Sequence, residues 1–79
     1  MILPNKIVQF DESIISKLPL ILSLLEEQSF EVLTLYTKTK RYFEDINQFV
    51  ITLDVLFVLG KVEIDKNSGR MKHAKKNYL

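Results

Sequence analysis

The stretch Asp45–Gly60, DINQFVITLDVLFVLG, decides the fold that we expect for this 79-residue chain. Its apolar residues recur at spacings of three and four, which is typical of a helix packed against a core. Two acids open the stretch, where the helix dipole favours them, and Gly60 follows the last apolar residue, where glycine often ends a helix. We expect these side chains to face the core: Ile46, Phe49, Val50, Leu53, Leu56 and Phe57. Truncating Phe57 to alanine is then expected to cost about 3–5 kcal/mol.

The residues after Gly60 predict a small β-hairpin. Val62–Asp65 alternates apolar and charged side chains, as a strand with one buried face does, and we expect it to pair with Arg70–Lys72. The turn between them contains an Asn and a Gly, which tolerate the positive φ angles of tight turns. A helix that runs through one glycine into a hairpin is typical of the second half of a winged helix-turn-helix.

Two further helices are predicted in the first half of the chain. A first helix follows a cap at Asp11 or Ser13, and Pro19 favours either a bend or a late start near Leu18 because an interior proline costs about 3 kcal/mol. Ser29 is the expected N-cap of a second helix over Phe30–Lys40.

The sequence therefore predicts one α+β domain over residues 1–79, a mostly helical winged helix-turn-helix. In the second helix, Val32, Leu33 and Tyr36 are expected to point inwards. A short strand over Lys6–Phe10 is expected to add to the hairpin, because two strands alone are marginally stable. Residues 73–79 are expected to form a flexible basic tail.

Composition argues against several functional classes. Eleven Lys and Arg face ten Asp and Glu, so the net charge of +1 gives no strong attraction to nucleic acid or an anionic membrane. Without cysteine, and with His73 as the single histidine, we expect no metal site and no cofactor. No acid pairs with a histidine at a useful spacing, and there is no Gly-rich phosphate loop, so we expect no enzyme.

Neither a targeting signal nor a membrane span is evident in the sequence. The start MILPNKIV lacks a cationic region, and the longest apolar stretch, Leu18–Leu25, is too short and too interrupted to cross a bilayer. We expect a cytoplasmic protein.

DNA binding is the usual function of a helix-turn-helix, but the central helix carries acids and no Lys or Arg. Asn47 and Gln48 could read adenine, yet no cation anchors them to phosphate. The basic residues lie elsewhere and could either touch DNA backbone or simply be solvated: Lys38, Lys40, Arg41, Arg70 and Lys72. A DNA-binding regulator is the alternative function.

The side of the central helix opposite the expected core is unusually apolar. Such a row either marks a protein contact or is covered within the domain by the N-terminal strand or first helix. The candidate partner-binding residues are Gln48, Ile51, Thr52, Val55, Val58 and Leu59. This pattern favours an interaction module over a DNA reader.

The opening MILPNKIVQFDESII, the helix LPLILSLL and the run FVITLDVLFVLGKVEID together resemble the middle component of bacterial ABC-three-component systems. These short proteins are encoded between an SMC-like ABC ATPase and a third, C-terminal component. The resemblance implies a non-enzymatic adaptor that links the ATPase to an effector in defence against phages and plasmids. It implies no catalytic residues, and this chain departs from the family's pattern at Pro19 and in the basic segment Arg70–Leu79.

Overall fold

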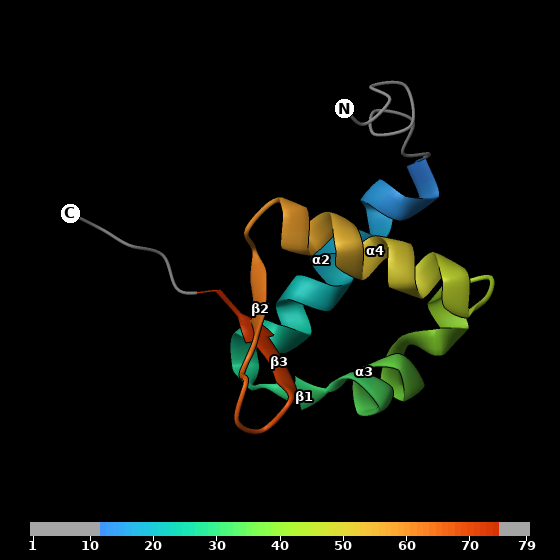
Figure 1. Cartoon of the computed structure of the whole chain (residues 1–79). Coiled ribbons are helices and arrows are strands. Elements are labelled where there is room, and N and C mark those ends of the chain that lie inside the picture. The colour runs from blue at the N-terminus through green and yellow to red at the C-terminus, as the bar shows by residue number, and fades with distance from the viewer. Residues whose placement is uncertain (1–11, 75–79) are drawn as a thin grey trace.

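The computed structural model describes residues 12–74, which form helices and strands in the order of a winged helix-turn-helix (Figure 1). This α+β architecture confirms the predicted fold class. The elements are α2 (Glu12–Glu27), β1 (Phe30–Glu31), α3 (Val32–Thr39), the 3-10 turn η1 (Lys40–Tyr42), α4 (Ile46–Val58), β2 (Val62–Ile64) and β3 (Arg70–His73).

The hairpin gains its third strand from the connection between α2 and α3. The antiparallel sheet has the order β1-β3-β2, with Phe30 opposite Met71 and Val62 opposite His73. The last strand in the sequence is therefore the middle strand of the sheet. The expected strand Lys6–Phe10 and residues 75–79 of the expected tail lie outside the described residues.

Helix α2 begins at Glu12 and continues through Pro19, so the expected late start near Leu18 is wrong. The proline lies on the exposed side of the helix, and Ile15, whose carbonyl loses its helical donor, is exposed as well. Water can therefore satisfy that carbonyl. The other side of α2 packs into the core through Ile14, Ile21 and Leu25.

The second helix starts later than the sequence predicts. Phe30 and Glu31 form β1, and Glu31 takes the N-cap position of α3 without a side-chain hydrogen bond. Ser29 does not cap the helix, because it accepts hydrogen bonds from the Arg70 guanidinium on β3 instead. Leu33, expected inside, is 73% exposed, and the buried residues of this helix are Leu35 and Thr39.

The core is centred on Phe49 of α4, which is 1% exposed. Its ring lies 4.9 Å from the Tyr36 ring of α3 and 5.4 Å from the Phe43 ring, the latter edge to face. Phe43 thus fills the space between the helices. Leu56 of α4 and Met71 of β3 belong to the same buried cluster.

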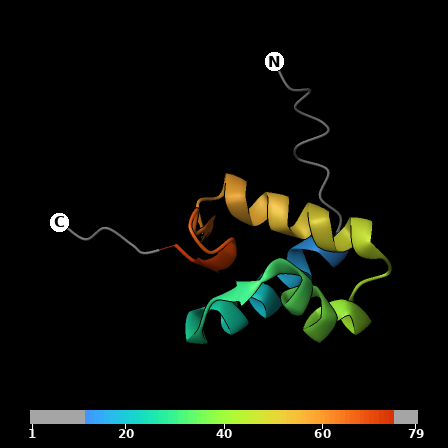
Figure 2. The same ribbon diagram turned by 60° about the horizontal axis from the view of Figure 1, so that its bottom comes forward.

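Helix α4 packs across α2 (Figure 2). It is rotated about its own axis relative to the orientation that the sequence predicts. Phe49, Leu53 and Leu56 are buried as expected, whereas Ile46, Val50 and Phe57 are exposed by 50%, 45% and 36%. The expected core position of these three residues is wrong. The buried side of α4 is turned towards α2 relative to the predicted side, by less than the rotation of about 100° that separates successive residues of a helix.

Both ends of α4 are closed by local hydrogen bonds. The Asp45 side chain accepts from the Gln48 backbone N–H at 3.0 Å, and the Gln48 amide oxygen accepts from the Glu44 N–H at 2.9 Å. At the other end Gly60 has φ +73°, and the N–H groups of Gly60 and Lys61 donate to the carbonyls of Phe57 and Leu56. This Schellman arrangement fixes the direction in which the hairpin leaves the helix.

The hairpin turn is closed in the same way. Gly69 has φ +73°, and its N–H donates to the Asp65 carbonyl at 2.7 Å. The Asn67 N–H donates to the Asp65 carboxylate at 2.9 Å, and this bond holds the pKa of that carboxyl below its usual range. The expected turn over Lys66–Gly69 is therefore present.

Candidate protein-interaction surface

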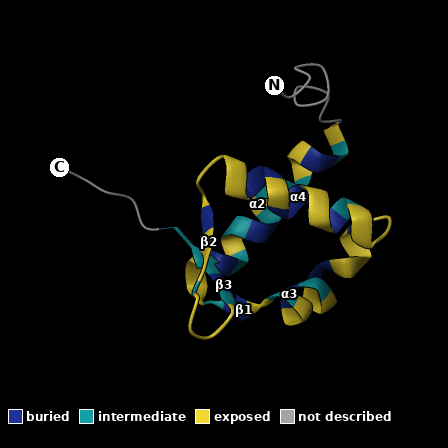
Figure 3. Cartoon of the chain, viewed as in Figure 1, coloured by how far each residue is buried: buried dark blue, intermediate teal, exposed yellow. Residues whose placement is uncertain are grey.

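The exposed side of α4 is mostly apolar. We call this surface the outer face of α4. It consists of Ile46, Val50, Ile51, Phe57 and Val58, with Asn47 and Asp54 among them. Val58 is 82% exposed, and the exposed residues of α4 follow the side turned away from α2 (Figure 3). A continuous exposed apolar row of this kind is typical of a binding surface.

The candidate partner-binding residues divide into exposed and enclosed groups. Ile51, Val58 and Leu59 are exposed, as the interaction hypothesis requires. Thr52 and Val55 are buried, so the expectation that they lie on an open surface is wrong. They face inwards because α2 covers that side of α4.

Gln48 is half-buried and makes hydrogen bonds within the domain. Its amide nitrogen donates to the Ser13 hydroxyl of α2 at 3.1 Å, while its amide oxygen accepts from the Glu44 N–H. The side chain thereby joins the start of α4 to the start of α2. It is engaged in the fold and is not directed towards a base or a partner.

Sequence reasoning missed Ile46, Val50 and Phe57 as surface residues. Helix α4 is apolar on nearly all sides, so periodicity alone cannot identify the buried one. The signal that could have found them is Asp54. Residues three and four positions away from an exposed acid share its side of a helix, and Val50 and Phe57 stand at those positions.

The charge of α4 is acidic, and no Lys or Arg occurs between Phe43 and Lys61. In a winged helix this helix normally enters the major groove, where it needs cations to meet phosphate. The outer face of α4 offers apolar side chains and one carboxylate. It therefore lacks the cations with which a recognition helix contacts the DNA backbone.

The candidate DNA contacts come from α3, η1 and β3, and three of them are engaged within the chain. Lys38 lies 5.9 Å from the Phe30 ring centre, and Arg41 stacks on Tyr42. The Arg70 guanidinium donates to the Ser29 hydroxyl at 2.9 Å and to the Ser29 carbonyl at 2.8 Å. Lys40 is exposed, and Lys72 is half-buried on β3.

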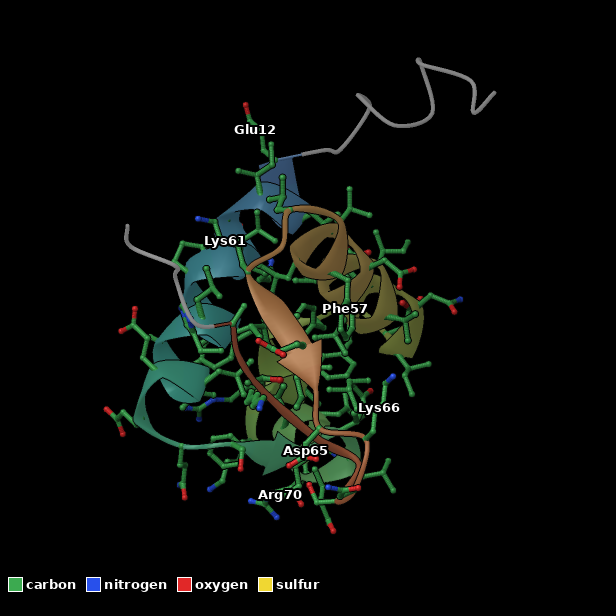
Figure 4. All side chains as sticks on the ribbon, turned by 60° about the vertical axis from the view of Figure 1, so that its left-hand side comes forward. Glu12, Phe57, Lys61, Asp65, Lys66 and Arg70 are labelled. Carbon is green, nitrogen blue, oxygen red and sulfur yellow. The ribbon has the colours of Figure 1, made fainter. Side chains whose placement is uncertain are left out.

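The wing carries charges along its strands and at its turn (Figure 4). Lys61 stands where β2 begins, while Asp65, Lys66 and Arg70 gather at the turn. Arg70 leans towards the segment before β1, in agreement with its bonds to Ser29. Of these cations, Arg70 therefore has a structural role.

Chemistry-bearing residues are sparse in the part of the chain that the structure describes. Within residues 12–74, no group of three His, Cys, Asp or Glu is placed to hold a metal ion. His73 Nε2 lies 3.9 Å from a carboxylate oxygen of Glu26, which links β3 to the end of α2. Within the same residues, none of the helices is both long enough and apolar enough to span a bilayer.

Comparison with known proteins gives one match. A protein-family model described as ABC-three component (ABC-3C) system Middle Component 7 matches residues 3–71. The matched range includes α2, α3, α4 and β2, and therefore the whole outer face of α4. No curated protein and no solved structure gives a significant match.

Proposed function

The chain belongs to the Middle Component 7 family of ABC-three component (ABC-3C) systems, and we propose that it is a non-enzymatic adaptor subunit of such a system. The family that the sequence resembles is thereby confirmed. A middle component works with the other components of its system, and the family is consistent with a role in defence.

In this proposal the protein bridges an SMC-like ABC ATPase and an effector component. The complex acts in the cytoplasm against phages and plasmids. No cofactor is required, because an adaptor works through binding alone.

The outer face of α4 is the observation that carries this proposal. A helix occupies the recognition position of a winged helix, while its exposed side chains are mostly apolar and include no cation. Contact between apolar side chains and water is unfavourable, and a partner that covers these side chains removes this cost in free energy. Association of this surface with another component would remove Ile51, Val58 and their neighbours from water.

Substitution of two exposed residues tests the proposal. Ile51→Asp and Val58→Asp each place a charge in the outer face of α4, where it would have to be desolvated on binding. Both side chains are exposed in the free protein, so the fold should be retained. We expect each variant to lose co-purification with the co-expressed ATPase and effector components.

Leu33→Asp is the matched control. Leu33 is also an exposed apolar residue, but it lies on α3. This variant should co-purify like the wild type, and circular dichroism should show that all three variants are folded. A complex that persists in Ile51→Asp and Val58→Asp would rule out the outer face of α4 as the contact.

A further inference from the structure

Asp54 is the single charged residue of the outer face of α4, and apolar side chains surround it. Val50 and Ile51 precede it by four and three residues, and Phe57 and Val58 follow it by three and four. These are the positions that adjoin a residue on a helix surface. Within residues 12–74, the side chain of Asp54 makes no hydrogen bond or ion pair. A partner that covers the apolar neighbours would therefore also cover a carboxylate without a counter-charge.

A second copy of the chain does not meet this requirement. Two-fold antiparallel pairing of α4 would cross near Thr52, the middle residue of the helix. Each Asp54 would then lie about 3 Å along the axis from the crossing point, so the two carboxylates would be close neighbours. No Lys or Arg of α4 could neutralise them, and burying like charges together is strongly unfavourable.

The backbone of α4 favours a helical occupant over an extended one. Its N–H and C=O groups are bonded within the helix and by the caps at Asp45 and Gly60, so it offers nothing to an added strand. An extended segment laid on this face would bury unpaired backbone groups. A helix satisfies its own backbone and can place side chains at matching intervals along the about 20 Å of α4.

We propose that the outer face of α4 receives an amphipathic helix of a partner component, whose apolar stripe carries an arginine or lysine that pairs with Asp54. This inference rests on the proposed adaptor function and specifies the chemistry of the partner. Arginine suits the position best, because its guanidinium can bond both carboxylate oxygens. The apolar neighbours supply the contact area, and the ion pair sets the register of the two helices.

The test uses the ATPase component and the effector component encoded with the protein, each purified separately. The affinity of each is measured for the wild type, Asp54→Asn and Asp54→Lys. Loss of one member of a buried charge pair typically weakens binding by more than tenfold. For the component that binds, we expect a loss of more than tenfold for Asp54→Asn and a larger one for Asp54→Lys. Raising the salt concentration should reduce the difference between wild type and Asp54→Asn.

Glu27→Lys is the control for charge. Glu27 is an exposed acid at the end of α2, so its reversal changes the net charge by the same amount as Asp54→Lys at a distant element. It should bind like the wild type. Carbodiimide coupling adds a structural readout, because it joins a carboxylate to a neighbouring lysine. Where the partner residue is a lysine, the wild type should give a cross-link that Asp54→Asn loses.

The outcomes separate the two levels of the proposal. If Ile51→Asp abolishes binding while both Asp54 variants bind like the wild type, the surface stands and the cationic partner is wrong. If none of these variants weakens binding, the surface itself is wrong, and the proposed function loses its support. If the isolated chain dimerises and Ile51→Asp prevents this, the occupant is a second copy and the inference is overturned.

Discussion

Phe49 joins the packing of α3 and α4 through two aromatic contacts. Tyr36 meets its ring in a tilted geometry, and Phe43 meets it edge to face. Such pairs add about 0.5–1.5 kcal/mol each to the area that the rings bury. Phe57, two turns further along the same helix, is 36% exposed and has no aromatic contact within the described residues. Two phenylalanines of one helix therefore make different contributions to stability.

Truncation of each phenylalanine should show this difference. Phe49→Ala removes a fully enclosed ring, and we expect it to lower the free energy of unfolding by about 3–5 kcal/mol. Phe57→Ala should cost only about 1 kcal/mol, because much of its ring is already in water. Urea denaturation measures both values. Equal losses would contradict the observed orientation of α4 and support the one expected from the sequence.

The error in the sequence prediction of α4 also begins with single residues. Gln48 and Thr52 lie opposite the apolar stripe that the sequence predicts to face the core, so they are expected on the outer side of the helix. The Thr52 hydroxyl, however, donates to the Gln48 carbonyl at 2.8 Å, which removes the cost of burying it. Gln48 is likewise satisfied by Ser13 and Glu44. Sequence shows the polarity of such side chains but not their partners, and this is why part of the candidate site was assigned to the wrong side.

At the scale of elements, Arg70 connects the wing to the helices. It lies on β3, and both of its hydrogen bonds reach Ser29, which precedes β1. The same two segments are joined by the pairing of Glu31 with Arg70. The side chain thus reinforces the contact between the middle strand and the short edge strand, which has only two residues.

Arg70→Ala should loosen this connection. Hydrogen bonds from a charged donor contribute about 1.5–3 kcal/mol, and partial exposure reduces this, so we expect a loss of about 1–2 kcal/mol in the free energy of unfolding. Arg70→Lys should restore little, because an ammonium cannot reproduce the forked geometry. Thermal or urea unfolding provides the measurement.

Lys66→Ala is the control for this pair of variants. Lys66 is an exposed cation at the hairpin turn and makes no hydrogen bond or ion pair within residues 12–74. Its removal should change stability by no more than about 0.5 kcal/mol. An equal loss for Lys66→Ala and Arg70→Ala would mean that charge, and not the bonds to Ser29, is responsible.

The elements themselves were largely predictable from the sequence. The end of α4 and the hairpin are predicted by Gly60, Gly69 and the alternation of apolar and charged residues after Gly60. Glycine marks a positive φ angle, and such alternation marks a strand with one buried face. The strand β1 was not predictable, since two residues with helix-compatible neighbours form a strand only when β3 lies beside them. The late helix start expected from Pro19 is wrong for a related reason: the sequence cannot show that this side of α2 is exposed.

At the scale of the whole molecule, the cations lie on elements other than α4. The chain is nearly neutral overall, but α4 carries no cation, and those of α3, η1 and β3 are partly engaged with Phe30, Tyr42 and Ser29. Phosphate backbones bind proteins in proportion to the cations that can replace counterions. The exposed cations Lys40, Lys61 and Lys66 lie outside α4, so the helix at the recognition position has no cation of its own for DNA.

A titration with duplex DNA at several salt concentrations tests this view. We expect binding no tighter than about 10⁻⁴ M at physiological salt, with little dependence on salt concentration. The isolated protein is used, so that DNA bound by another component does not contribute. Micromolar affinity with a steep salt slope would instead support the alternative of a DNA-binding regulator.

The sheet order β1-β3-β2 has a consequence for synthesis of the protein. The middle strand, Arg70–His73, is translated after both of its neighbours, and Met71 within it belongs to the core. Until those residues leave the ribosome, β1 and β2 have no strand to pair with, and the core lacks the packing of Met71. Helices can form early on the nascent chain, but the sheet cannot. Folding of this domain is therefore completed only after its last strand has emerged.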